Sequence, residues 1–135
     1  MEEVVDMPQS ILVVEDEWHI RKLTTMALKS RGYQVIEAEN GLQAIEHLHH
    51  YKVDLVMTDW MMPGMDGRVL IQKIRERVES KDLPVVVFSG INPQIQSAEL
   101  EQLGINCWLS KPCRIHKIVE MVSSVLDPPL RQVIH

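Results

Sequence analysis

Residues 53–67 read VDLVMTDWMMPGMDG and combine a short apolar run with an abrupt break. The run, residues 53–58, has the length and content of a buried β-strand, and Pro63 with Gly64 indicates a loop soon after it. Asp59 therefore stands directly after the predicted strand. In α/β proteins, ligands bind at the carboxyl ends of parallel strands, so Asp59 is the first candidate functional residue.

Polar side chains follow three other apolar runs in the same way. Each group stands at the end of a predicted strand: Glu15 and Asp16 after residues 11–14, Ser89 after residues 85–88, and Lys111 after residues 106–110. The carboxyl ends of parallel strands meet at one edge of a sheet. Carboxylates, a hydroxyl and a lysine gathered there predict a site for a divalent cation and a phosphoryl group.

Strand and helix patterns alternate along the chain, which predicts an α/β fold with a parallel sheet. The nearly continuous apolar runs indicate strands buried on both faces, with helices packed on each side. The predicted strands are residues 11–14, 33–38, 53–58, 84–89 and 106–110. The predicted helices are residues 18–31, 40–50, 67–78, 93–103 and 115–126, and the segment 93–103 has the weakest apolar pattern of these.

Apolar residues at helical spacing predict the buried face of each helix. Asn40 followed by Gln43 is close to a capping box, and Gly32 stands where a helix C-cap glycine belongs. The residues expected on buried faces are Ile20, Leu23, Ala27 and Leu28, then Leu42, Ile45 and Leu48, then Leu70, Ile71, Ile74 and Val78, and lastly Ile115, Ile118, Val119, Val122, Val125 and Leu126.

The size and charge of the chain exclude several classes of protein. A length of 135 residues fits one domain, expected at 10–127, with an N-terminal extension at 1–9 and a tail or linker at 128–135. The net charge of −5 argues against direct nucleic-acid binding. Apolar stretches fall short of the roughly 18–20 residues of a membrane span, and the acidic N-terminus is unlike a secretory signal, so a cytoplasmic protein is expected.

Cysteine and histidine residues give no sign of a second site. Cys107 and Cys113 lie in neither a zinc nor a redox pattern, and we expect two reduced thiols. His47 and His50 are three residues apart on a predicted helix, with His49 between them. Because no further ligand completes a metal site nearby, a solvated helix face is the expected interpretation.

The chemistry of the strand-end residues centres on Asp59. Like charges about 4 Å apart cost roughly 4 kcal/mol per pair at an effective dielectric near 20, so clustered carboxylates favour a bound cation. Mg²⁺ suits an all-oxygen site that leaves positions for water and phosphate. With Mg²⁺ and Lys111 neutralising charge, Asp59 could act as a nucleophile and form an acyl phosphate, while Ser89 donates its hydroxyl to the same phosphate.

Four motifs resemble the receiver domain of two-component response regulators, a chemotaxis-receiver-like domain. They are residues 13–17 (VVEDE), 58–67 (TDWMMPGMDG), 88–90 (FSG) and 109–112 (LSKP), in the order found in that family. The similarity extends from about Ser10 to Leu126. It implies a doubly wound, flavodoxin-like (βα)5 fold with strand order 2-1-3-4-5, which sets the first strand beside the third.

The resemblance also assigns roles to the strand-end residues. It implies that Asp59 is the phosphoacceptor and that Asp16 and the Met61 backbone carbonyl bind Mg²⁺ beside it, while Glu15 acts on the metal through water. Ser89 would be the switch hydroxyl. Lys111 would pair with the phosphate and would be joined to Pro112 by a cis peptide. Trp108 stands where the family usually has the Tyr or Phe of its rotamer switch, and Cys113 replaces a common Phe.

The partners follow from the same resemblance. A sensor histidine kinase or a phosphotransfer protein would donate the phosphoryl group. The output would be a downstream protein or a second copy of the chain, docking on the face formed by the fourth helix, the fifth strand and the fifth helix. The protein would be no enzyme beyond its own phosphotransfer and self-dephosphorylation. The self-dephosphorylation is expected to be slow, because Met61 and Ile91 are both apolar and cannot hold a hydrolytic water.

The same residues bear on three other functions. A haloacid-dehalogenase-type phosphatase would need a second acid two residues after Asp59, where this chain has Met61. A flavin- or dinucleotide-binding domain needs a phosphate-cradling loop after the first strand, and residues 15–17 (EDE) would repel a phosphate there. A receiver-like interaction module without phosphorylation remains open, although the intact set of acids, serine and lysine speaks against it.

Overall fold

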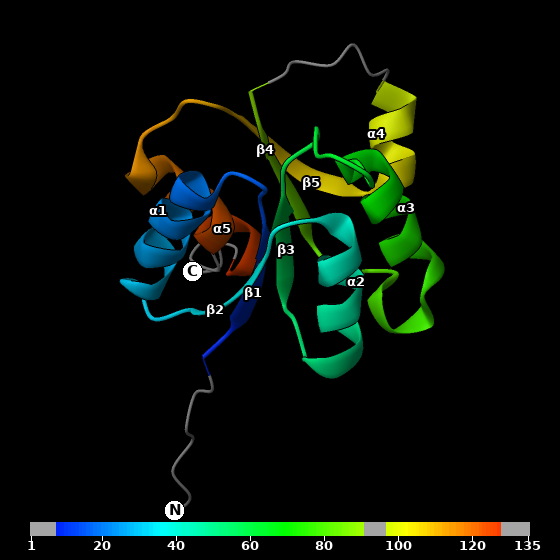
Figure 1. Ribbon diagram of the computed structural model, residues 1–135, viewed down its shortest axis with the longest axis horizontal. Helices are drawn as coiled ribbons and strands as arrows, with labels where there is room; N and C mark the ends of the chain where they lie inside the picture. Colours follow the sequence, from blue (N-terminus) through cyan, green and yellow to red (C-terminus); the bar gives the residue numbers. More distant parts are fainter. Residues whose placement is uncertain (1–7, 91–96, 128–135) are drawn as a thin grey trace, which may run out of the picture.

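The computed structural model describes residues 8–90 and 97–127, which form one parallel sheet flanked by helices (Figure 1). Its strands are β1 (Ser10–Val14), β2 (Gln34–Ala38), β3 (Leu55–Thr58), β4 (Val85–Ser89) and β5 (Ile105–Ser110). They pair in parallel in the order β2-β1-β3-β4-β5. The predicted fold and strand order are confirmed, and strand boundaries shift by two residues at most.

The helices cover both faces of the sheet. Figure 1 shows α1 (Trp18–Lys29) and α5 (Ile115–Leu126) on one side, and α2 (Gly41–His50), α3 (Gly67–Glu76) and α4 (Ser97–Leu103) on the other. A short 3-10 turn, η1 (Val78–Ser80), follows α3. The predicted fourth helix began at residue 93, and that start lies outside the described residues.

Alternation along each strand divides the buried residues into two cores. In β1, Ile11 and Val13 pack toward α1 and α5, while Leu12 and Val14 pack toward α2 and α3. Successive side chains point to opposite faces of a sheet, so a strand covered on both faces must be apolar at every position. This is why the strands appear in the sequence as continuous apolar runs.

The predicted signals at Asn40, which starts a helix, and at Gly32, which follows one, are confirmed. The Asn40 side chain accepts a hydrogen bond from the Gln43 amide at 2.8 Å, and the Gln43 side chain accepts one from the Glu39 amide at 2.9 Å. Asp66 caps α3 by accepting from the Val69 amide at 2.9 Å. Gly32 has a φ of +92° just after α1, a conformation that favours glycine.

Four residues predicted to lie on buried helix faces are exposed instead. Their exposed fractions are 52% for Leu23, 71% for Leu42, 80% for Val78 and 48% for Ile115. In α1 the buried positions beside Ala27 and Leu28 are filled by two threonines, Thr24 and Thr25, which a purely apolar pattern overlooks. The helix is therefore rotated, and Leu23 faces outward.

The other three corrections concern helix ends. Leu42 lies in the first turn of α2, where Gly41 and Ala44 make the buried contacts. Val78 lies beyond α3, because Arg77 has an extended backbone that ends the helix at Glu76. Ile115 is the first residue of α5, and the burial of that helix begins with Ile118 and Val119. At each of these helix ends, the predicted buried face included an apolar residue that lies outside the buried part of the helix.

The structure also describes the cysteines, the histidines of α2 and the lengths of the helices. Cys107 and Cys113 are free and half-buried. The His47 ring lies 5.7 Å from the Tyr51 ring, and the described residues that could share a metal ion are carboxylates alone. Across the part of the chain that is described, each helix is too short or too polar to cross a membrane.

Candidate functional site

The central strands bring the predicted acids together at their carboxyl ends. The sheet ladder continues just past β1 and β3, where the Asp59 amide donates to the Val14 carbonyl at 3.1 Å. On the other side, the Glu15 amide donates to the Ala38 carbonyl of β2 at 3.0 Å. Backbone pairing thus fixes the starting points of Glu15, Asp16 and Asp59 before any side chain interacts.

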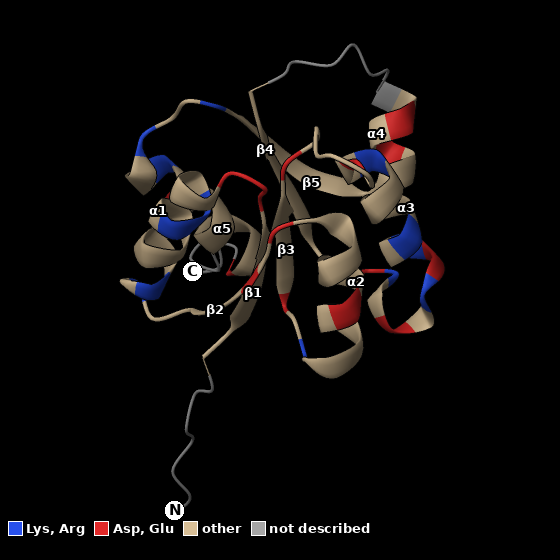
Figure 2. Ribbon diagram, in the orientation of Figure 1, with Lys and Arg blue, Asp and Glu red and all other residues tan. Residues whose placement is uncertain are grey.

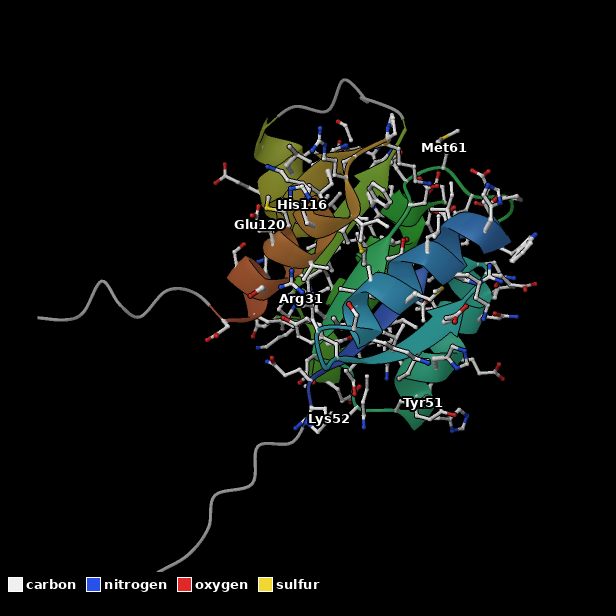
Figure 3. All side chains as sticks on the ribbon, turned by 90° about the vertical axis from the view of Figure 1, so that its left-hand side faces the viewer. Arg31, Tyr51, Lys52, Met61, His116 and Glu120 are labelled. Carbon is white, nitrogen blue, oxygen red and sulfur yellow. The ribbon has the colours of Figure 1, made fainter. Side chains whose placement is uncertain are left out.

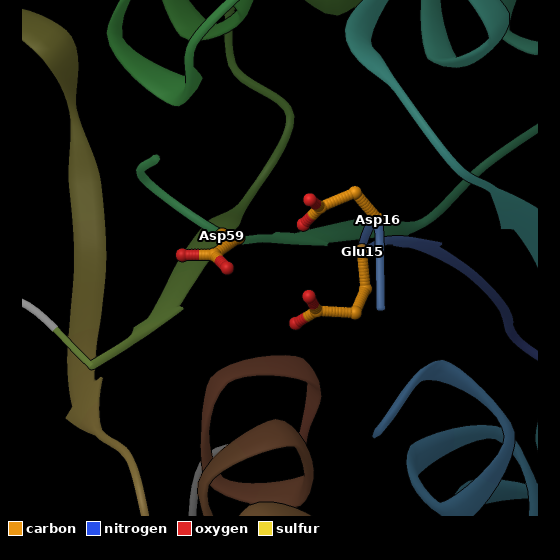
Figure 4. A group of neighbouring side chains, drawn as sticks. All are labelled: Glu15, Asp16 and Asp59. Atoms are coloured by element: carbon orange, nitrogen blue, oxygen red, sulfur yellow. The ribbon is translucent and has the colours of Figure 1, made fainter. Parts of the chain in front are cut away.

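The carboxylates form a compact group. One oxygen from each of Glu15, Asp16 and Asp59 lies within 4.8 Å of the other two, and Figure 4 shows the side chains facing a shared space. Glu15 and Asp59 are buried, whereas Asp16 is exposed. Figure 2 shows acidic residues in the loops after β1 and β3. Mg²⁺ binds oxygens at about 2.1 Å, so opposite ligands lie about 4.2 Å apart, and carboxylate oxygens within 4.8 Å of one another are close to that spacing.

Lys111, the residue directly after β5, reaches the same group. Its amide donates to the Ser89 carbonyl at 2.9 Å, and the Lys111–Pro112 peptide is cis, as predicted. The ammonium Nζ donates to Asp59 Oδ2 at 2.9 Å and to Glu15 Oε1 at 2.6 Å. It also lies 5.3 Å from the centre of the Phe88 ring. The lysine therefore bridges two of the acids.

Burial and pairing act on the ionisation of these groups in opposite directions. Burial lowers the pKa of Lys111, but the hydrogen bonds and charges of Glu15 and Asp59 outweigh it, so the pKa is raised above its usual value. Burial raises the pKa of the Glu15 carboxyl, and Lys111 only partly offsets that shift. A charged lysine at neutral pH is the state that both carboxylates favour.

The backbone around Asp59 holds its second oxygen. Asp59 Oδ1 accepts from the Trp60 amide at 2.7 Å and more weakly from the Met61 amide at 3.4 Å. The first residue of α3, Gly67, lies against the Asp59 backbone, and a Cβ on Gly67 would stand 2.4 Å from the Asp59 carbonyl oxygen. Sequence reasoning missed these roles of Trp60 and Gly67, although the Asp66–Gly67 pair signalled a tight approach.

Ser89 ends β4, the strand beside β3, and Trp108 lies on β5. Ser89 is buried at the end of β4, level with Ser110 of β5. Trp108 is half-buried, and its ring packs on the Trp60 ring with centroids 5.1 Å apart and planes at 51°. Its indole nitrogen is buried with no acceptor among the described residues. Trp60, which directly follows Asp59, thus links the acid to Trp108.

Met61 has its side chain at the surface. It is 55% exposed and projects from the loop after β3, at the opposite end of the molecule from Tyr51 and Lys52 (Figure 3). Its amide approaches Asp59, as noted above. An apolar, exposed side chain at this position leaves the space in front of Asp59 without a polar group from residue 61.

Comparison with known proteins gives consistent matches. The model of the response regulator receiver domain matches residues 11–123. Chemotaxis protein CheY-3 of Vibrio cholerae is 32% identical over 128 residues, which cover 94% of this chain and 98% of CheY-3. The crystal structure of a response regulator receiver protein from Pseudomonas putida matches with a TM-score of 0.81 and 30% identity, covering 89% of this chain and 99% of that one.

A longer relative matches over part of its length. The phosphate regulon transcriptional regulatory protein PhoB of Pseudomonas aeruginosa is 30% identical over 118 residues, or 87% of this chain and 52% of PhoB. The chain thus spans about half the length of PhoB. The family match, the strand order and the strand-end acids agree with one another, and the chain belongs to the response regulator receiver domain family of two-component signalling systems.

Proposed function

We propose that Asp59 is the phosphoacceptor of this receiver domain, which occupies residues 10–127. The observation that carries the proposal is the placement of Asp59: buried at the end of β3, with one oxygen on the Lys111 ammonium and the other on the Trp60 amide. Such a carboxylate is fixed in orientation and faces an exposed acid, Asp16, at the rim. The donor is the phosphohistidine of a sensor histidine kinase or a phosphotransfer protein.

In the proposed transfer, an oxygen of Asp59 attacks the phosphorus of the donor. The bond from phosphorus to the imidazole nitrogen breaks, its electron pair stays on that nitrogen, and an acyl phosphate forms on Asp59. Lys111 supplies positive charge where the phosphoryl oxygens arrive. The Ser89 hydroxyl, at the end of the next strand, donates to one of those oxygens.

Mg²⁺ is the proposed cofactor. Asp16, Asp59 and the Met61 backbone carbonyl would hold the ion, and Glu15 would contact it through water. When bound, Mg²⁺ neutralises the acids and the phosphoryl oxygens. The oxygen spacing within the acid group supports this assignment.

The proposed output surface is the face of α4, β5 and α5, read by a downstream protein or by a second copy of the chain. Support comes from the contact between Trp60, adjacent to the acceptor, and Trp108 on β5. A rearrangement at Asp59 therefore has a short, packed route to this face.

Incubation with acetyl phosphate and Mg²⁺, followed by intact-mass measurement, tests the proposal. The wild-type protein should gain one phosphoryl group, and chelation of the metal should prevent the gain. Asp59→Asn should remain unmodified while keeping the wild-type circular dichroism spectrum. A phosphorylated Asp59→Asn protein would rule out Asp59 as the acceptor, and an unmodified wild-type protein would favour the interaction module without phosphorylation.

A further inference from the structure

Glu15 is held at both of its carboxylate oxygens. Oε1 accepts from the Lys111 ammonium at 2.6 Å, and Oε2 accepts from the Glu17 backbone amide at 3.2 Å. The side chain is 4% exposed. Because the Glu17 amide fixes one oxygen and the side chain is buried, the other oxygen is a rigid acceptor for the Lys111 ammonium.

Lys111 is shared unequally between its two acids. Its ammonium is 2.6 Å from Glu15 and 2.9 Å from Asp59, so the shorter contact is to the residue that is not the proposed nucleophile. The lysine side chain is 13% exposed and rests near the Phe88 ring. Charge-assisted hydrogen bonds of this kind are about twice as strong as neutral ones.

We propose that Glu15 is a positioning residue for Lys111 in the phosphotransfer reaction, beyond any contact it makes with the metal through water. This inference rests on the proposed function of Asp59. When Asp59 forms the acyl bond, its bonded oxygen loses its negative charge and becomes a weak acceptor. Glu15 keeps its charge, so it holds the ammonium beside the phosphoryl oxygens during and after the transfer.

The length of the glutamate side chain suits this role. An aspartate at position 15 would withdraw the carboxylate by about one carbon–carbon bond, roughly 1.5 Å. The amide of Glu17 and the ammonium of Lys111 could then no longer both be reached. Glu15→Gln keeps the length of the side chain and removes its charge, so it tests the contribution of the charge alone.

A double-mutant cycle without metal tests the pairing directly. Urea midpoints are measured in chelator for wild type, Glu15→Gln, Lys111→Met and the double variant. Glu15→Gln should lower the midpoint in the wild-type background. In the Lys111→Met background it should leave the midpoint unchanged or raise it, because it then removes a buried carboxylate that has lost its partner. Equal downward shifts in both backgrounds would overturn the proposal.

Phosphorylation rates distinguish an effect of Glu15 on Lys111 from an effect of Glu15 on Mg²⁺ binding. With acetyl phosphate and Mg²⁺ raised until the rate no longer increases, Glu15→Gln should be phosphorylated about tenfold more slowly than wild type, the effect of one charge-assisted hydrogen bond. The substitution should have no further effect in the Lys111→Met background. Full recovery at high Mg²⁺, as expected for the metal-ligand control Asp16→Asn, would contradict the proposal.

The two arms keep this inference apart from the proposed function. Phosphorylation of the wild-type protein but not of Asp59→Asn tests the acceptor, and the metal-free cycle needs no phosphorylation at all. If Lys111→Met cannot be phosphorylated, the rate of Glu15→Gln at saturating Mg²⁺ decides the outcome together with the metal-free cycle.

Discussion

Asp59 owes its orientation to groups that the chain places around it. The Trp60 amide holds one oxygen and Lys111 the other, while Gly67 lets the start of α3 lie against the Asp59 carbonyl. A side chain held in this way loses little further freedom when it reacts. This pre-organisation, rather than an unusual chemical group, is what would suit Asp59 to the proposed phosphotransfer.

We expect the lifetime of the proposed acyl phosphate on Asp59 to depend on the residues at positions 61 and 91. Loss of the phosphate requires a water opposite the leaving oxygen of Asp59, and neither Met61 nor Ile91, which lies outside the described residues, can orient or deprotonate that water. Self-dephosphorylation should therefore be slow. Replacing Met61→Asn together with Ile91→Glu should speed the decay about tenfold or more, measured by intact mass after removal of the donor.

A matched control for that change is Met61→Leu, which keeps an apolar side chain at the same position. Its decay should equal that of the wild type. A decay rate that is the same in the polar double variant as in Met61→Leu would exclude this explanation of the lifetime.

Arg75, near the end of α3, connects three elements. Its guanidinium donates to the carbonyls of Leu83, before β4, at 2.7 Å, of Leu103, at the end of α4, at 2.8 Å, and of Gly104 at 2.9 Å. Arg75→Met should lower the free energy of unfolding by about 2–3 kcal/mol, because carbonyls lose a charged donor. Urea unfolding measures this.

The exposed Lys73 on the same helix provides the control. Lys73→Met should change the free energy of unfolding by less than about 0.5 kcal/mol. Equal effects of Arg75→Met and Lys73→Met would show that the carbonyl contacts do not stabilise the junction of α3, α4 and β4.

Glu37 attaches the edge strand β2 to α1. It accepts from Arg21 and from Lys22, each at 3.0 Å. Burial raises the pKa of Glu37, but these two partners outweigh it, so the folded-state pKa lies below the ordinary value of 4.5. A depressed carboxyl pKa contributes stability that is fully present above the unfolded value and is lost as the pH falls through the folded value.

The comparison of wild type with Glu37→Gln isolates this contribution. At neutral pH the wild type should be the more stable protein in urea. The difference should shrink as the pH falls below 4.5, because the acid that makes it becomes protonated. A difference that stays constant or widens on acidification would contradict the assignment of this ion pair.

At the scale of the whole molecule, Trp60 and Trp108 form a packed route from Asp59 to the face proposed for docking. Trp60 contacts Trp108 on β5, beside the short α4 that the sequence marks as weakly patterned. Beryllofluoride, a mimic of the phosphoryl group, should therefore change amide hydrogen exchange in residues 90–108. Mass spectrometry of peptides checks this, and changes confined to residues 40–50 would refute the placement.

Most of the architecture could be predicted because strands buried on both faces leave an unmistakable apolar signature. Strand-end residues such as Asp16 and Asp59 then fall at one edge of the sheet. The sequence did not predict which face of α1 is buried. Thr24 and Thr25 occupy buried positions of that helix, whereas the apolar pattern placed Leu23 on the buried face. The pairing of Lys111 with Glu15 joins residues directly after β5 and β1 that no local pattern connects.

Mapping the phosphoryl group gives the most direct test of the proposed chemistry. Borohydride reduces an aspartyl acyl phosphate to an alcohol, which marks the modified residue for peptide mass spectrometry. After treatment with acetyl phosphate and Mg²⁺, the reduced side chain should be found at Asp59 and depend on Mg²⁺. Reduction at Asp16 or Glu15, or a phosphoryl group that borohydride leaves intact on a serine or histidine, would contradict Asp59 as the phosphoacceptor.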